Sequence, residues 1–188
     1  MTADPARHRT PEELEAALDH IRQAPTDQGT LELIVRRPAV DEREVLETGQ
    51  LSMEEGLVGD TWNQRSSSKT PDGSPLIDAQ INIMNARTAA AIAGPSERWA
   101  LAGDQLYIDL DISLETLPAG TQLAIGTAVI EVTAEPHTGC AKFSSRFGVE
   151  ALRFVNSPTG RALNLRGINA RVVQPGTIHT GDQITRRP

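Results

Sequence analysis

The feature that most constrains the fold is a change in hydrophobic period close to Pro25. Before it, apolar residues recur at helical spacing, whereas after it short segments alternate between apolar and polar residues. In residues 106–113, Leu and Ile alternate with Tyr, Asp and Ser, as in a strand with one buried face. Segments rich in Gly, Pro and polar residues, such as residues 63–75, separate these short runs. A mainly β-structure is therefore expected.

The pattern predicts about six to eight strands and few helical crossovers between them. Parallel strands need long crossover connections, so an antiparallel β-barrel, or a closely related β-rich α+β fold with a few short helices, is expected. The strand candidates are residues 31–35, 43–51, 79–84, 106–113, 121–125, 128–135, 168–173 and 183–185.

One amphipathic helix is expected at the N-terminus. Thr10 is a helix N-cap candidate, Pro11 suits the first helical position, and Glu13 completes a capping box. Short helices are also predicted over residues 86–93 and 149–156. We expect a helical lead-in over residues 1–29 and a single β-barrel domain over residues 30–188.

Composition limits the classes of partner. The 188 residues carry 18 Lys and Arg against 25 Asp and Glu, a formal charge of −7, which argues against a sequence-independent nucleic-acid binder. The N-terminus lacks the apolar run of a signal peptide, and no stretch is apolar enough for a membrane span, so a cytoplasmic protein without a membrane partner is expected. The single cysteine rules out an internal disulfide and a multi-thiolate zinc site.

That cysteine, Cys140, lies in the segment EPHTGCAKFSSRFG, residues 135–148. Pro136 cannot donate a ladder hydrogen bond and marks where strand pairing stops, so the thiol is expected in a loop just beyond a strand. His137, Lys142 and Arg146 flank it, and nearby positive charge favours the nucleophilic thiolate form of a cysteine. These residues alone leave two possibilities open, a reactive thiol and a half-buried packing thiol.

The segment PHTGCAKFSSRFGVEALRFVN, residues 136–156, closely resembles the signature of the MOSC family. This domain forms the C-terminal end of molybdenum-cofactor sulfurases and also occurs as stand-alone bacterial proteins. The resemblance extends to GDQLYIDLDISLETLPAGTQLAIGTAVIEVT before it, to GRALNLRGINARVVQPGTIHTGD after it, and to EEGLVGDTW upstream. It covers about residues 30–185 and is strongest over residues 103–182.

The resemblance implies a MOSC-type β-barrel in which Cys140 holds sulfur, as a persulfide, for transfer to a metal cofactor. A molybdenum cofactor, with its pterin, is implied as ligand or acceptor. The chain shows no pyridoxal-phosphate desulfurase portion and no flavin, haem or iron–sulfur signature. The implied partners are therefore a sulfur donor protein, a molybdoenzyme, or both, together with a small oxyanion or pterin ligand.

His137 and Lys142 are candidates to activate Cys140, and five residues are candidates for binding the ligand. Each has a plain alternative: a surface histidine for His137, solvated charges or surface ion pairs for the basic residues, and a turn role for the aspartate. A metal site from His137, Cys140 and the distant His179 has spacing too weak to predict. The ligand-binding candidates are Asp60, Arg146, Asn156, Arg161 and Arg166.

The main functional hypothesis is a stand-alone sulfur carrier or transferase that uses Cys140. A second possibility is a non-catalytic module that binds a molybdenum cofactor or an oxyanion, in which Cys140 ligates metal. A third is a partner subunit of a molybdenum-dependent reductase.

Overall fold

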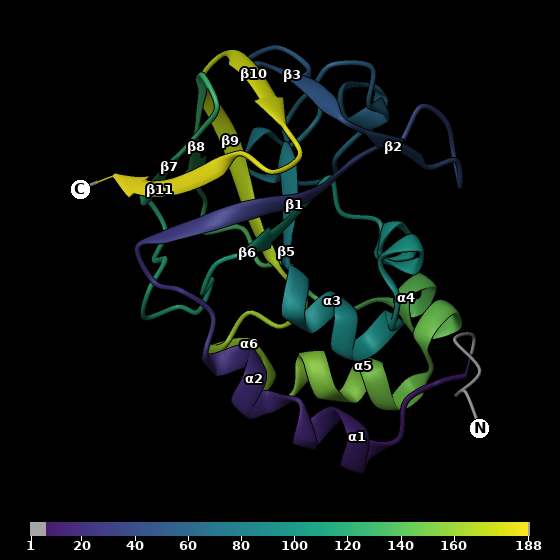
Figure 1. Ribbon diagram of the computed structural model, residues 1–188. Helices are drawn as coiled ribbons and strands as arrows, with labels where there is room; N and C mark the ends of the chain where they lie inside the picture. Colours follow the sequence, from purple (N-terminus) through teal and green to yellow (C-terminus); the bar gives the residue numbers. More distant parts are fainter. Residues whose placement is uncertain (1–6, 188) are drawn as a thin grey trace.

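The computed structural model describes residues 7–187 and shows a closed, mixed β-barrel with a layer of short helices on one side (Figure 1). Around the barrel the strands follow the order β1, β11, β7, β8, β9, β5, β6 and back to β1. The predicted fold class is confirmed. The barrel strands are β1 (Gln28–Arg36), β5 (Ile81–Asn85), β6 (Leu106–Asp109), β7 (Gln122–Ile125), β8 (Ala128–Val132), β9 (Ile168–Gln174) and β11 (Gln183–Arg187).

One strand pair corrects the expectation of a wholly antiparallel barrel. β5 and β6 run parallel, with Ile83 opposite Leu106 and Asn85 opposite Ile108. The connection between them holds α3 (Ala86–Ala93) and the 3₁₀ segment η3 (Ser96–Ala102), which together carry the chain back to the start of β6. This is a βαβ unit, the arrangement that parallel neighbours require. The sequence prediction excluded βαβ units because few helical crossovers are expected between the strands, whereas α3 and η3 form one between β5 and β6.

A second difference from the predicted strands lies in the segment that follows β1. The single strand expected over residues 43–51 is two strands, β2 (Glu44–Leu46), which pairs antiparallel with the end of β1, and β3 (Thr48–Ser52). β3 belongs to a separate small sheet with β4 (Gly56–Leu57) and β10 (Gly176–His179), and β10 was not predicted. The small sheet lies above one end of the barrel (Figure 1).

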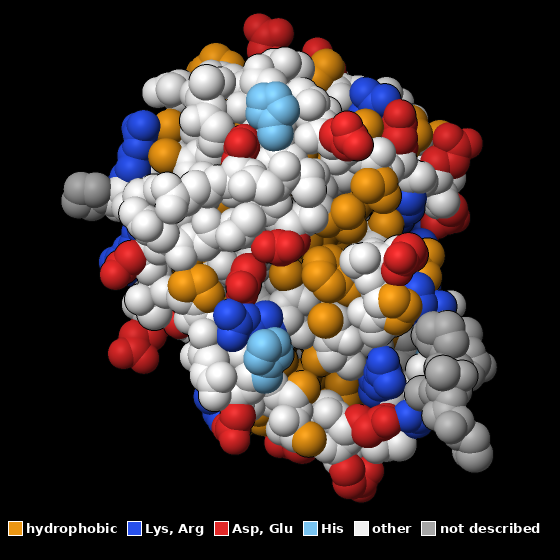
Figure 2. All heavy atoms as spheres, in the orientation of Figure 1, with side chains coloured by type: hydrophobic (Ala, Val, Ile, Leu, Met, Phe, Trp, Pro, Cys, Tyr) orange, Lys and Arg blue, Asp and Glu red, His pale blue; other side chains and the backbone are white. Residues whose placement is uncertain are grey.

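The apolar residues form two cores. The first fills the barrel with Leu, Ile and Val side chains from its strands, and the second lies between the outer face of the barrel and the helices. Tyr107, expected on the polar face of an alternating strand, is fully buried in the second core because α3 and η3 cover that face. Its hydroxyl donates to the carbonyl oxygen of Trp99 at 2.6 Å. Part of the seam between barrel and helices reaches the surface as a group of apolar side chains (Figure 2).

The N-terminal helix begins as predicted. Thr10 and Glu13 form a capping box at the start of α1 (Pro11–Ala16), and α2 (Leu18–Arg22) follows directly. Both helices pack on α3, and α1 also contacts α5 (Val149–Asn156), burying Leu14, Leu18 and Ile21 in the second core. Within residues 7–187, no helix has the length and apolarity needed to cross a membrane.

The helices after Cys140 complete this layer. The predicted α3 and α5 are observed with the predicted bounds, whereas α4 (Ala141–Phe147) and α6 (Pro158–Ala162) were not predicted. α4 packs against α5 and η3 and buries Phe143 and Phe147. The first residue before α4 is Cys140, so the helical layer sets the position of the thiol relative to the barrel.

Candidate functional site

A cleft of about 710 Å³ opens where the segment after β1, the loop after β4, the turn before β6 and the start of α4 meet. Its volume falls in the range of small-molecule sites. Six of the lining residues are Arg or Lys, and Asp41 is the one acidic residue among them. The lining residues are Arg37, Pro38, Ala39, Val40, Asp41, Arg43, Thr61, Gln64, Arg65, Asn82, Ala102, Gly103, His137, Cys140, Lys142, Phe143, Arg146 and Arg166.

Cys140 lines this cleft and is exposed to solvent. It follows the loop of residues 133–139 and precedes α4, with an extended backbone. The preceding residue, Gly139, is held in place by Asn156 on α5: its N–H donates to the amide oxygen at 3.0 Å, and its carbonyl accepts from the amide nitrogen at 3.2 Å. The position of the thiol is therefore fixed from the helical layer.

A buried triad of charged and polar groups forms the inner wall. Asp104, in the turn before β6, accepts from Arg166 Nη1 at 2.7 Å with one oxygen and contacts His137 Nε2 at 2.6 Å with the other. Burial would raise the pKa of Asp104, but the charge of Arg166 and the contact with His137 hold it at about 2. Burial and the neighbouring Arg166 lower the pKa of His137. His137 is therefore neutral at pH 7, with Nε2 donating to the carboxylate and Nδ1 left as an acceptor.

Arg166 makes two further contacts and keeps one buried nitrogen unpaired within residues 7–187. It lies over the ring of Phe143, 5.0 Å from the ring centre, and its Nη2 donates to the carbonyl oxygen of Ala102 at 3.0 Å. Its Nε is buried and has no hydrogen-bond partner among residues 7–187. A buried donor without a partner is uncommon in proteins, so this Nε is a candidate contact for a molecule in the cleft.

A second buried ion pair supports the floor of the cleft. Asp60 caps the 3₁₀ turn η1 (Thr61–Gln64) and accepts from Arg37 Nε at 2.8 Å and Nη2 at 2.7 Å. Arg37 also donates to the Asn82 side chain at 2.8 Å and to the carbonyl oxygen of Gly103 at 2.9 Å. Because most of its donors are used within the chain, Arg37 acts mainly as a structural link between β1 and β5.

Arg43 and Arg65 face the cleft with little of their donor capacity used. Arg43 donates to the carbonyl oxygen of Glu42 at 2.6 Å, and its buried Nε has no partner within the described residues. Desolvation, and then the charges of Arg146 and Arg37, lower the pKa of Arg43. Arg65 makes one 3.4 Å contact with Thr61 Oγ1. These side chains are available to an anionic ligand.

The structure brings five of the eight predicted site residues into the cleft. Cys140, His137, Lys142, Arg146 and Arg166 line it, with Lys142 at the exposed rim. Within residues 7–187 no hydrogen bond joins His137 to the thiol; the imidazole is bound to Asp104 instead.

The other three predicted residues do not line the cleft. Asp60 is buried behind it and positions Arg37. Asn156 and Arg161 line a separate cavity of about 360 Å³ on the other side of the 133–138 loop, which His137 and Arg166 also border. Arg161 donates to the backbone of Asn156 at 3.1 Å.

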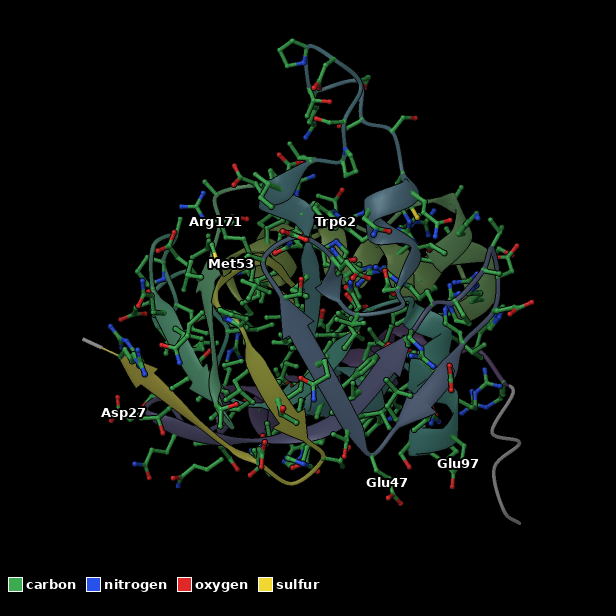
Figure 3. The ribbon with its side chains drawn as sticks, turned by 90° about the horizontal axis from the view of Figure 1, so that it is seen from above. Asp27, Glu47, Met53, Trp62, Glu97 and Arg171 are labelled. Atoms are coloured by element: carbon green, nitrogen blue, oxygen red, sulfur yellow. The ribbon has the colours of Figure 1, made fainter. Side chains whose placement is uncertain are left out.

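Sequence reasoning missed Arg37, Arg43, Arg65 and Asp104. Gly103-Asp104 is a sequence typical of a turn, in which Gly supplies the positive φ, and Gly103 does adopt a left-handed conformation with φ 92°. However, the Asp104 side chain is fully buried, which turn chemistry does not explain. The pair Arg36-Arg37 stands before Pro38, which is typical of the end of a strand and by itself indicates no site. Arg65 begins the polar loop of residues 65–75, which projects from the body above Trp62 (Figure 3).

Chemically, the cleft combines an accessible thiol with an excess of positive charge in a chain of negative net charge. Clefts lined by one sign of charge concentrate ligands of the other sign. Over residues 7–187, no group of three or more His, Cys, Asp or Glu side chains is placed to hold a metal ion. The arrangement suits an anion, bound beside a sulfur nucleophile.

The chain is similar in structure to bacterial proteins of known structure. It aligns with the YuaD protein from Bacillus subtilis at 17% identity and a TM-score of 0.62, covering 85% of this chain and 95% of that one. It aligns with YiiM from Escherichia coli at 17% identity and a TM-score of 0.55, covering 85% of this chain and 70% of that one. These alignments establish a shared fold. No curated protein sequence matches the chain significantly.

The family assignment depends on the sequence of the barrel itself. The model of the MOSC domain matches residues 78–185, which include β5 to β11, the 133–139 loop and Cys140. This match covers more than half of the chain. The protein therefore belongs to the MOSC domain family.

Proposed function

We propose that this MOSC protein carries or transfers sulfur as a persulfide on Cys140, toward an oxidised acceptor bound in the cationic cleft. One observation carries the proposal: the exposed thiol opens onto the same cleft as six basic side chains. This arrangement supports a role in which the sulfur atom acts beside an anion bound by these cations.

The loading step is a thiol–disulfide exchange. The Cys140 thiolate attacks the terminal sulfur of a donor persulfide, a new S–S bond forms, and the donor leaves as its thiolate. The terminal sulfur of the resulting Cys140 persulfide is anionic. Lys142 and Arg146, on the first two turns of α4, provide positive charge on the same side of the cleft.

In this proposal His137 is a general base that acts through Nδ1, without a hydrogen bond to the Cys140 thiol within residues 7–187. Since its Nε2 donates to Asp104, only Nδ1 could accept a proton from a sulfur donor or from an acceptor group in the cleft. A neutral histidine oriented by a buried carboxylate is a common arrangement for a general base. Asp104 would be the positioning residue of that pair.

The residues of the cleft fit an anionic, molybdenum-cofactor-type acceptor. Arg43 and Arg65 have free donors, and the Nε atoms of Arg43 and Arg166 are buried without partners in the described chain. Guanidinium groups bind phosphate and related oxyanions with forked geometry. When bound, such a group would supply the oxidised centre that accepts sulfur.

A second function is favoured by the absence of a base next to the thiol. In the described part of the chain, Cys140 has no hydrogen-bonding side chain to activate it, while the cations are well placed to hold an anion. The protein would then be a binding module for an anionic cofactor or the partner subunit of a molybdenum-dependent reductase. In that case Cys140 would serve as a ligand to the bound metal.

Intact-mass spectrometry after incubation with a small-molecule persulfide tests the main proposal. We expect an adduct of about 32 Da, the mass of one sulfur atom, that is transferred to an added acceptor thiol. Cys140 is the only cysteine, so Cys140→Ser is a complete control. Absence of the adduct, together with oxyanion binding that Cys140→Ser leaves unchanged, would favour the binding module.

A further inference from the structure

Asp41 is the one carboxylate among the residues that line the cleft, and it contacts two of the cations. Its Oδ1 lies 3.1 Å from Arg146 Nη2 and 3.7 Å from Lys142 Nζ, although 64% of the side chain is exposed. The backbone of Asp41 is in the left-handed region, with φ 60°, which a residue other than glycine rarely adopts. The carboxylate is thus turned toward Arg146 by an uncommon local conformation.

Two other cations that line the cleft, Arg43 and Arg65, have no carboxylate partner in the described part of the chain. No ion pair of Arg43 or Arg65 is present among residues 7–187 within 4 Å, and Arg43 Nε is buried without a hydrogen bond. The two sets of cations lie close together. A Cβ atom added to Gly103 would lie 3.6 Å from Arg43 Nη2 and 3.8 Å from Arg146 Nη1, so both guanidinium groups approach the same point.

We propose that Asp41 occupies an anion subsite of this cleft from within the chain, and that the cleft takes a ligand with two adjacent anionic groups, as in a diphosphate. One group binds Arg43 and Arg65, which are open. The other displaces Asp41 from Arg146 and Lys142. This inference rests on the proposed function, because it assigns the ligand class of the same cleft.

Displacement of Asp41 requires little rearrangement. The side chains of Asp41 and Lys142 are 64% and 70% exposed and only Arg146 is half-buried, and ion pairs with an exposed partner contribute little to stability because water replaces that partner. The neighbouring Val40 is 82% exposed, so few packing contacts hold this segment in place. A phosphate group offers Arg146 a stronger, forked contact than one carboxylate oxygen at 3.1 Å.

The test is the affinity of the full chain for inorganic pyrophosphate, measured by isothermal titration calorimetry at constant ionic strength, with Asp41→Asn compared to the wild type. Asparagine has the same shape and tolerates the left-handed backbone, so the variant keeps the loop conformation. We expect Asp41→Asn to bind pyrophosphate about three- to tenfold more tightly, with a smaller gain for orthophosphate. Asp19→Asn, on the exposed face of α2, removes the same charge away from the cleft and should leave the affinity unchanged.

The outcomes separate the two proposals. Equal or weaker binding of pyrophosphate by Asp41→Asn overturns the role of Asp41 but leaves the cleft as an anion site. An equal gain in Asp19→Asn also overturns it, because net charge alone would then explain the result. If neither wild type nor variant binds an anion, the ligand site of the proposed function fails along with the subsite, whereas persulfide loading of Cys140 is measured separately.

Discussion

His137 Nε2 lies 2.6 Å from Oδ1 of Asp104, a carboxylate with no exposed surface. The other oxygen of Asp104 accepts a hydrogen bond from Arg166, which lies 62 residues later in the chain. One buried negative charge therefore orients both the imidazole and the guanidinium that form the inner wall of the cleft. The stability of the barrel and the geometry of the site depend on the same side chain.

Replacing Asp104 tests this dependence. Asp104→Asn leaves the Arg166 cation buried without its partner, and breaking a buried pair in this way costs about 3 kcal/mol or more. Urea unfolding at pH 7 measures the change. As a control, Asp19→Asn removes one carboxylate of an exposed pair on α2 and should change the free energy of unfolding by less than about 0.5 kcal/mol. A similar small loss for Asp104→Asn would show that the triad does not stabilise the fold.

The same triad predicts loss of stability in acid. The pKa of Asp104 is about 2 in the folded protein against 3.8 as a model value, so its contribution is full above pH 3.8 and is lost as the pH falls toward 2. This amounts to roughly 2 kcal/mol.

His137 acts in the same direction at higher pH. Its pKa is lowered from 6.5 on folding, so below about pH 6.5 the unfolded chain takes up a proton that the folded chain does not. The free energy of unfolding should therefore decrease as the pH falls below 6.5. His137→Gln should flatten this part of the profile, measured by urea unfolding between pH 7 and 5. An unchanged slope would contradict the buried, neutral state of His137.

Two arginines of the cleft should respond differently to removal of their charge. Arg37→Met leaves the fully buried Asp60 carboxylate unpaired and should lower the free energy of unfolding by about 3 kcal/mol. Arg65→Met removes a side chain with a single weak contact, so stability should change by less than about 0.5 kcal/mol while phosphate affinity falls about fivefold. Chemical unfolding and calorimetry of both variants measure this contrast. Equal losses of stability would refute it.

The two hydrogen bonds between Asn156 and Gly139 should affect the reactivity of the Cys140 thiol but not the binding of anions in the cleft. Asn156→Ala removes both hydrogen bonds to Gly139 and should cost about 1–2 kcal/mol in stability. We expect slower persulfide loading of Cys140, measured by timed mass spectrometry, with pyrophosphate affinity retained. Arg153→Ala, an exposed change on the same helix, is the matched control and should load at the wild-type rate.

Gly167 should tolerate no side chain. Its φ is 122°, and an added Cβ atom would meet the Ile83 carbonyl oxygen and lie 2.9 Å from His137 Cδ2. Gly167→Ala should therefore lower the free energy of unfolding by more than about 3 kcal/mol, through strain and displacement of His137. Gly120→Ala has a similar positive φ but open space around it, so only strain of about 1 kcal/mol is expected. Comparing the thermal unfolding of Gly167→Ala and Gly120→Ala separates the cost of backbone strain from the cost of the steric clash.

Local signals in the sequence predicted much of the fold. The capping box at Thr10, the helices over residues 86–93 and 149–156 and the β-barrel were all expected from capping and hydrophobic period. Such signals act over a few residues, and they were sufficient there because capping and hydrophobic period are encoded within each element. The environment of Tyr107 was not predictable in this way, because α3 and η3 bury a face that alternation marks as polar.

The sequence by itself therefore determined the β-rich fold class, the family resemblance and the segment around Cys140. Only the tertiary structure decided which charges meet: Arg37 with Asp60 across 23 residues, and Asp104 with Arg166 across 62. Ion pairs between residues so far apart leave no periodic pattern, since their energy depends on burial and on distances of about 3 Å that the closed barrel alone establishes. For the same reason His137, next to the cysteine loop in sequence, is bound in space to Asp104.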